Sequence, residues 1–174
     1  MLILGVDPGL RATGYGLVEG SMQGVRLIDA GVIRTSDDAP LSRRLNDIHE
    51  RLSVIFSHHA LTAVAVEDLY AAPRYPRTAI LMGHVRGVVC QAAAARAIEV
   101  VALPPAAVKQ AVAGFGAASK EQVQRAVRHL CALASPLDAH AADAVAMALV
   151  ALSRNGVPLR APAAIPAAAH GGAG

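Results

Sequence analysis

The sequence has few of the features that mark secreted or membrane-spanning proteins. It holds only two cysteines, Cys90 and Cys131, which form no CxxC pair, so we interpret them as small buried hydrophobic residues in a reducing compartment. The apolar stretch near residues 88–95 is bounded by Arg86 and Arg96. No run reaches the roughly 18 to 20 residues of a membrane span. The chain begins in an apolar, strand-like run without a basic leader, which favours a cytoplasmic protein that does not enter a membrane.

Charged residues are also scarce, at 17% of 174, whereas hydrophobic residues make up 54%. This balance excludes general disorder, and the length fits one domain with a sizeable core. A net charge of +3 does not by itself identify a partner. The region from residue 74 to residue 128 nevertheless gathers basic residues, which form either a face for a phosphate backbone or ordinary solvated helix faces: Arg74, Arg77, Lys109, Lys120, Arg125 and Arg128.

Hydrophobic periodicity predicts a mixed α/β fold. Short apolar runs separated by turn residues predict an antiparallel meander of strands at 2–7, 13–19 and 25–34, followed by strands at 61–66 and 98–103. Steps of three and four between apolar residues predict helices at 40–57, 77–97, 105–113, 119–132 and from Ser135-Pro136 to about 153. We therefore expect a five-stranded sheet with helices on both faces in a single domain, residues 1–154. Residues 155–174, rich in Ala, Pro and Gly, are expected to form a disordered tail.

Two carboxylates follow apolar strands. Asp7 ends the first strand and Glu67 ends the fourth, and a helical crossover should make these strands parallel, so the two side chains are expected side by side. Buried carboxylates are costly unless they are paired, hydrogen-bonded or bound to metal. Asp7 taken alone has another explanation, because Asp before Pro8-Gly9 is also a good turn former.

The last helix adds two further candidate ligands. His140 and Asp143 share one helix face in an otherwise small, apolar segment. Asp138 points elsewhere, and we assign it to the helix N-terminus in a Ser135-x-x-Asp138 pattern rather than to a metal. Three carboxylates and one imidazole suit two Mg²⁺ or Mn²⁺ ions that promote phosphodiester hydrolysis, although zinc would also accept such ligands.

A set of motifs in a fixed order resembles the RuvC family of crossover (Holliday) junction endodeoxyribonucleases. The resemblance covers roughly residues 1–152. The motifs are Leu4-Gly5-Val6-Asp7-Pro8-Gly9, Thr13-Gly14-Tyr15-Gly16, Ala65-Val66-Glu67-Asp68-Leu69-Tyr70, Arg86-Gly87-Val88, Val108-Lys109-Gln110, Gly114-Phe115-Gly116, Ser119-Lys120 and Ala141-Ala142-Asp143-Ala144.

This resemblance implies a ribonuclease H-like fold and a homodimer that nicks two strands of like polarity at symmetric positions in four-way junction DNA, in recombination and repair. It assigns metal-binding carboxylates to Asp7, Glu67 and Asp143. It also implies base stacking by Tyr70, contacts of Lys109 and Lys120 with the scissile strand, and the branch-migration proteins RuvA and RuvB as partners. With the other basic residues, we expect Arg74 and Arg77 to bind DNA.

The helix at 77–97 favours dimerisation independently of the resemblance. Its apolar residues cover most of the circumference, and Gly83 and Gly87 would let another backbone approach closely. The polar residues Arg77, His84 and Gln91 form only a narrow polar stripe along the helix. A two-fold dimer suits a substrate with two equivalent strands. Complete burial in a monomer core is the alternative.

Two other functions share parts of the pattern. Sugar kinases and actin-like ATPases carry an Asp-x-Gly loop like Asp7-Pro8-Gly9, but they need two lobes, and this chain has room for one. A junction-binding protein without catalysis is the other alternative, against which all four site positions carry metal-competent residues. A smaller resolvase-like family shares the opening motif, but the block from Val108 to Lys120 favours RuvC.

His140 departs from the pattern, because many family members have a fourth carboxylate at this position and only some have histidine. A ligating imidazole must be neutral, so we predict that cleavage fails as the pH falls through the titration of His140. The test is a pH profile of cleavage by the wild type and by His140→Asp. A profile shared by both proteins would contradict the prediction.

Overall fold

The computed structural model describes residues 1–68 and 76–161, which form five strands and five helices. In chain order these elements are β1 (Leu2–Asp7), β2 (Ala12–Ser21), β3 (Gly24–Arg34), α1 (Leu41–His58), β4 (Ala63–Glu67), α2 (Pro76–Ala94), β5 (Glu99–Leu103), α3 (Pro105–Ala113), α4 (Lys120–Leu130) and α5 (Ala139–Arg154).

The strands form one sheet in the order β3-β2-β1-β4-β5. β1, β2 and β3 pair as an antiparallel meander, whereas β4 runs parallel to β1 and β5 runs parallel to β4. In the register, Val6 lies opposite Val66, so the next residue of each strand is a carboxylate at the same edge. The predicted meander and the predicted parallel pairing of the first and fourth strands are both confirmed.

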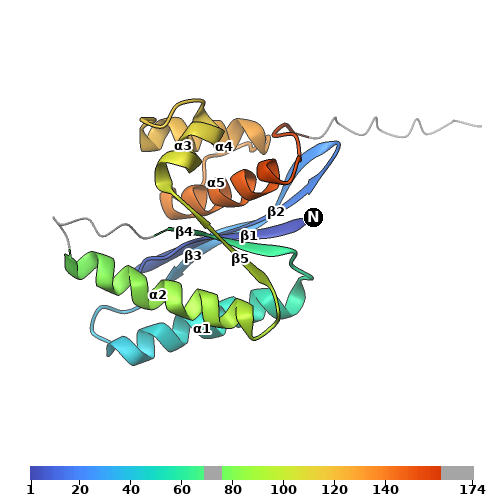
Figure 1. The fold of residues 1–174 in the computed structure, drawn as a ribbon. Coiled ribbons are helices and arrows are strands. Elements are labelled where there is room, and N and C mark those ends of the chain that lie inside the picture. Colours follow the sequence, from blue (N-terminus) through green and yellow to red (C-terminus); the bar gives the residue numbers. More distant parts are fainter. Residues whose placement is uncertain (69–75, 162–174) are drawn as a thin grey trace, which may run out of the picture.

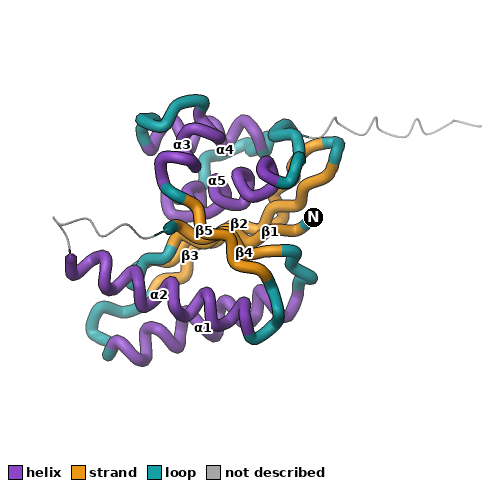
Figure 2. The backbone as a smooth tube through the Cα atoms, in the orientation of Figure 1, coloured by secondary structure: helices purple, strands orange, loops and turns teal. Residues whose placement is uncertain are grey.

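Helices cover both faces of the sheet. α1 and α2 lie against one face, while α5 lies against the other, with α3 and α4 beside it (Figure 1). The tube view shows the same three layers, with strands between two helical layers (Figure 2). A separate hydrophobic cluster fills each interface, one centred on Ile48, Leu52 and Val85, the other on α5 residues such as Leu149. This arrangement is the expected ribonuclease H-like fold.

α5 lies unusually close to the sheet because glycines face it. A Cβ added to Gly5 of β1 would come within 1.8 Å of the Ala144 carbonyl oxygen, and one added to Gly14 of β2 within 2.0 Å of the His140 carbonyl oxygen. Neither Gly5 nor Gly14 can therefore carry a side chain while α5 stays in this position. The close approach places the polar residues of α5 beside the end of β1.

The ends of two helices differ from the predictions. α5 begins at Ala139 rather than at Ser135-Pro136, because the Asp138 side chain accepts a hydrogen bond from the His140 backbone N–H and so caps the helix itself. The expected Ser135-x-x-Asp138 pattern is therefore wrong in detail. α2 ends at Ala94, three residues before the expected 97, and Ala97 lies beyond it with a φ of 54°.

Two smaller expectations also change. Both cysteines are half-buried rather than fully buried, and burial raises the pKa of Cys131 to about 11. Residues 155–161, expected to open the tail, pack onto the domain: Val157 is buried, and the Arg160 carbonyl oxygen accepts a hydrogen bond from the Val25 N–H. Residues 162–174 lie outside the described residues. Within the described residues, no helix is both long enough and apolar enough to cross a membrane.

Candidate active site

Four predicted site residues come from three elements that meet at one edge of the sheet. Asp7 is the last residue of β1 and Glu67 is the last residue of β4. His140 and Asp143 lie in the first turns of α5, one turn apart on the same side. The parallel register of β1 and β4 and the close approach of α5 therefore bring together residues far apart in the sequence.

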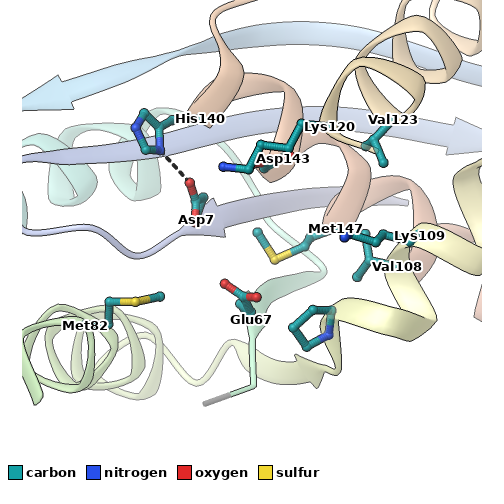
Figure 3. Close-up of a pocket in the computed structure, with 11 residues that line it drawn as sticks. Asp7, Glu67, Met82, Val108, Lys109, Lys120, Val123, His140, Asp143 and Met147 are labelled. Atoms are coloured by element: carbon teal, nitrogen blue, oxygen red, sulfur yellow. Dashed lines mark hydrogen bonds and ion pairs between the residues drawn. The ribbon is translucent and has the colours of Figure 1, made fainter. Parts of the chain in front are cut away.

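All four side chains line a single pocket (Figure 3). Lys109 of α3 and Lys120 of α4 line the same pocket and add positive charge beside the carboxylates. The remaining wall is apolar and consists of Met82, Pro105, Val108, Val123 and Met147. The pocket thus combines carboxylates, two ammonium groups and an apolar wall. This combination is suited to binding a cation and a phosphate together.

A hydrogen bond joins two of the candidate ligands. His140 Nδ1 lies 2.8 Å from Asp7 Oδ2 (Figure 3). Asp7 is the more buried partner, with 15% of its side chain exposed against 44% for His140. In the neutral tautomer that donates from Nδ1, the imidazole holds the carboxylate in one orientation and keeps the Nε2 lone pair available.

Crowding of negative charge raises the pKa of two carboxyl groups. Burial raises the pKa of Glu67 above its ordinary value, and the charges of Asp7 and Asp143 raise it further. Burial and the charge of Asp7 likewise raise the pKa of Asp143. Lys120 and Lys109 oppose both shifts. The folded chain therefore holds carboxylates together against their mutual repulsion, which a bound cation would relieve.

The donor set fits a hard divalent cation by its chemistry. Carboxylate oxygens are the preferred ligands of Mg²⁺ and Mn²⁺, and one imidazole is compatible with Mn²⁺. Among the described residues, no three His, Cys, Asp or Glu side chains already surround one point closely enough to hold an ion.

Local hydrogen bonds hold the start of α4, which carries Lys120, and the end of β4. α4 begins at a capping box, in which Ser119 accepts from the Gln122 N–H and the Gln122 side chain accepts from the Ser119 N–H. Lys120 is the first residue of this helix, and its side chain extends into the pocket beside Asp143 (Figure 3). On the opposite side, Arg86 Nε of α2 donates to the Glu67 carbonyl oxygen at 3.2 Å.

The other predicted residues divide into three groups. Arg77 is exposed in the first turn of α2. Asp138 caps α5 and pairs with Arg34, in agreement with its assignment to the helix end rather than to the pocket. Tyr70 and Arg74 lie outside the described residues.

Some pocket residues were not predicted from the sequence. Met147 lies one turn after Asp143 and shares its face of α5, so helical periodicity contains a signal for it. Met82, Pro105 and Val123 reach the pocket from three other helices or their ends, and no local pattern in the sequence marks them.

Comparison with known proteins identifies the family. The profile of the family described as "Crossover junction endodeoxyribonuclease RuvC" matches residues 3–151. The chain belongs to the RuvC family. A RuvC relative from Rhodopirellula baltica is 45% identical over 150 residues, which are 84% of this chain and 83% of that protein.

Solved structures agree with this membership. The RuvC structure of Thermus thermophilus has a TM-score of 0.81 and 36% identity, and the match covers 90% of this chain and 97% of that one. A second structure, described as T. thermophilus RuvC in complex with Holliday junction substrate, has a TM-score of 0.80 and 36% identity, covering 90% and 96%. Membership of this nuclease family implies dependence on a divalent metal ion. It also sets aside the sugar kinase, the actin-like ATPase and the smaller resolvase-like family.

From the raised pKa values of Glu67 and Asp143 we predict how thermal stability depends on pH. A carboxyl group whose pKa is raised in the folded state destabilises the fold above that pKa, and the penalty disappears as the pH falls through it. Without metal, Glu67→Gln and Asp143→Asn should therefore melt at a higher temperature than the wild type at neutral pH. This gain should vanish as the pH falls below the ordinary values of 4.5 and 3.8.

Thermal unfolding in EDTA across this pH range is the measurement. Glu99→Gln, which changes an exposed carboxylate at the start of β5, is the control and should leave the melting temperature nearly unchanged. If the two site variants melt at the same temperature as the wild type at neutral pH, or at a lower one, repulsion between the site carboxylates does not destabilise the fold.

Proposed function

We propose that this RuvC-family chain is a structure-selective endonuclease that resolves Holliday junctions by paired symmetric nicks. The observation that supports this most directly is the pocket in which Asp7, Glu67, His140 and Asp143 meet Lys109 and Lys120. Family membership adds the substrate class, since the similar T. thermophilus protein is described in complex with a Holliday junction. No feature of the described residues favours a binding protein without catalysis over this function.

We further propose that Asp7, Glu67, His140 and Asp143 hold two ions, either Mg²⁺ or Mn²⁺. When bound, such ions activate a water and stabilise the leaving oxygen of a phosphodiester. The clustered carboxylates support this proposal, because their repulsion is relieved by positive charge. Hydrolysis in this site adds water at phosphorus and breaks the P–O3′ bond, which leaves a nick that a ligase can seal.

The chain's own basic groups bind and orient the substrate. Lys109 and Lys120 line the pocket and are placed to hold the phosphate of the scissile strand, while the apolar wall excludes water from its other side. Arg77 extends this contact along the molecule from the start of α2. Tyr70 and Arg74 remain proposed DNA-binding residues on the basis of the sequence. RuvA and RuvB as partners and a cytoplasmic location are proposed on the same basis.

The proposed activity predicts cleavage of a synthetic four-way junction but not of a matched linear duplex. Paired symmetric nicks are expected with Mg²⁺ or Mn²⁺ and should be absent in EDTA. Asp7→Asn should lower the cleavage rate about a hundredfold or more, because it removes a charged ligand, while junction binding persists. Gel analysis of end-labelled strands measures the nicks, with Glu99→Gln as the control. Junction binding without cleavage under either metal would leave only the non-catalytic binder.

We also propose that α2 carries the dimer interface. Val85, Val89 and other small apolar residues of α2 are buried against the domain, but Ile80 remains 60% exposed. A groove between α1 and α2 is lined by Leu45, Val88 and Gly87, among others, and a Cβ added to Gly87 would meet no atom within 4 Å. A second copy of α2 can therefore approach this side of the helix closely. A symmetric dimer presents two active sites to two equivalent strands.

The dimer proposal predicts that Ile80→Asp weakens self-association at least about tenfold, because the interface would bury an unpaired charge. Sedimentation velocity over a range of concentrations is the measurement. Val54→Asp is the matched control, because Val54 is also an exposed aliphatic residue, 54% exposed, but lies on α1. Identical sedimentation of Ile80→Asp and the wild type would exclude this surface.

A further inference from the structure

The end of strand β3 contacts both segments that carry the Asp7–His140 pair. Arg34 is the last residue of β3 and pairs with Ala12 at the start of β2, and Thr35 follows it. Neighbouring residues of an extended chain point to opposite faces of a sheet. Arg34 accordingly reaches α5 on one face, and Thr35 reaches α1 and the β1–β2 loop on the other.

On the α5 side, three contacts lead from Arg34 to Asp7. Arg34 Nη2 lies 3.1 Å from Asp138 Oδ2. The other carboxylate oxygen of Asp138 accepts a hydrogen bond of 2.9 Å from the His140 backbone N–H. His140 Nδ1 in turn lies 2.8 Å from Asp7 Oδ2. The cap of α5 therefore sets where the backbone of His140 sits, and with it whether the imidazole reaches Asp7.

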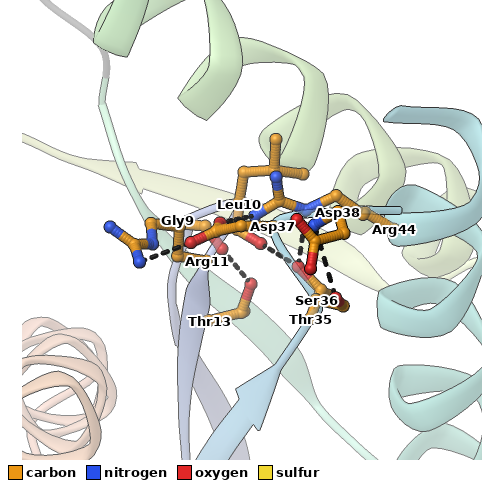
Figure 4. A network of polar contacts seen from close by, with 9 residues as sticks. All are labelled: Gly9, Leu10, Arg11, Thr13, Thr35, Ser36, Asp37, Asp38 and Arg44. Carbon is orange, nitrogen blue, oxygen red and sulfur yellow. Dashed lines mark hydrogen bonds and ion pairs between the residues drawn. The ribbon is translucent and has the colours of Figure 1, made fainter. Parts of the chain in front are cut away.

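On the α1 side, Thr35 holds the loop that follows Asp7 (Figure 4). Its hydroxyl donates to the Leu10 carbonyl oxygen at 2.6 Å and accepts from Arg44 Nε at 2.8 Å. Its backbone N–H donates to the Arg11 carbonyl oxygen at 3.2 Å. Because the loop from Pro8 to Arg11 directly continues β1, these bonds restrain the chain just after the carboxylate.

Arg44 makes this restraint rigid. Arg44 is 8% exposed, and among the described residues it is the only charged residue that is buried. Its Nη2 lies 2.9 Å from Asp37 Oδ1, and the second oxygen of Asp37 pairs with Arg11 of the same loop (Figure 4). A buried guanidinium tolerates few alternative arrangements, because every other position leaves its charge unpaired. The loop is thus fixed against α1 rather than only against its own strand.

We propose that Arg34 and Thr35 form a two-sided clamp, which positions the Asp7 carboxylate and the His140 imidazole relative to each other. The inference rests on the proposed function, in which this pair serves the metal site. Neither Arg34 nor Thr35 lines the pocket, so both are positioning residues. Asp138 and Arg44 transmit their effect on the two faces of the sheet.

The test compares clamp variants with matched variants at distant positions. Arg34→Gln removes the ion pair to Asp138, and Thr35→Val removes the hydroxyl at constant shape. Arg26→Gln is the control for the first, since Arg26 pairs with Glu19 at 2.8 Å at the far end of the same β2–β3 hairpin. Thr62→Val is the control for the second, since Thr62 accepts a hydrogen bond of 3.1 Å from the Leu2 N–H, away from the site.

Two measurements report directly on the geometry of the site. The first is the NMR signal of the His140 imidazole in metal-free protein, assigned with His140→Gln. The second is Mn²⁺ binding to the protein without DNA, measured by electron paramagnetic resonance. We expect Arg34→Gln to raise the half-saturating Mn²⁺ concentration about threefold, because its ion pair is exposed, and Thr35→Val about tenfold, because its bonds are internal. Both should shift the imidazole signal, whereas the two controls should leave it in place.

A further pair of variants separates capping from charge. Asp138→Asn keeps a capping side chain but loses the ion pair, so it should shift the imidazole signal as Arg34→Gln does, whereas Asp138→Ala loses both and should shift it further. Thermal unfolding is recorded for all variants. If the clamp variants are destabilised but keep the wild-type imidazole signal and Mn²⁺ affinity, their role is only structural and the proposal is overturned. If the wild type binds Mn²⁺ but fails to cleave junctions, the proposed function fails while the clamp remains measurable.

Discussion

The close contact of α5 with β1 and β2 is the constraint on which the site depends. Gly5 and Gly14 leave no room for a side chain between helix and sheet, since an added Cβ would lie 1.8 Å and 2.0 Å from carbonyl oxygens of α5. The helix can therefore lie only where its backbone touches the strands. Asp143 directly precedes Ala144, and the carbonyl oxygen of His140 itself lies against Gly14. Both residues are therefore held within reach of the end of β1, although they lie far from it in the sequence.

The same contact imposes an electrostatic cost on the folded chain. Asp7, Glu67 and Asp143 share one partly buried pocket, and the pKa values of the latter two rise because burial and neighbouring charge disfavour their ionised forms. Hydrophobic packing on both sheet faces supplies the free energy that offsets this repulsion. A site arranged in this way is less stable empty than filled, so cation binding and folding stability are coupled.

Much of this arrangement was predictable, because it follows from local periodicity. Short continuous apolar runs predicted β1 and β4, the crossover rule predicted that they are parallel, and a three-residue spacing predicted that His140 and Asp143 share one face. The start of α5 was missed, because Ser135-Pro136 and Asp138 are competing start signals that only tertiary contacts separate. The Arg34–Asp138 pair joins residues 104 positions apart, and no sequence period encodes such a contact.

The histidine at position 140 connects these features. In the proposed metal site, a fourth carboxylate there would add another negative charge to three that already repel one another, whereas an imidazole in its neutral form would offer a nitrogen without that repulsion. In exchange, the proposed metal site would lose an anionic oxygen for the cation. His140 instead makes a hydrogen bond to Asp7 that depends on direction as well as distance. A carboxylate could turn either oxygen toward a metal, whereas an imidazole can bind only if its ring is oriented with the free nitrogen toward the metal. A chain with histidine at this position therefore has greater need of a firmly capped α5 than one with a carboxylate.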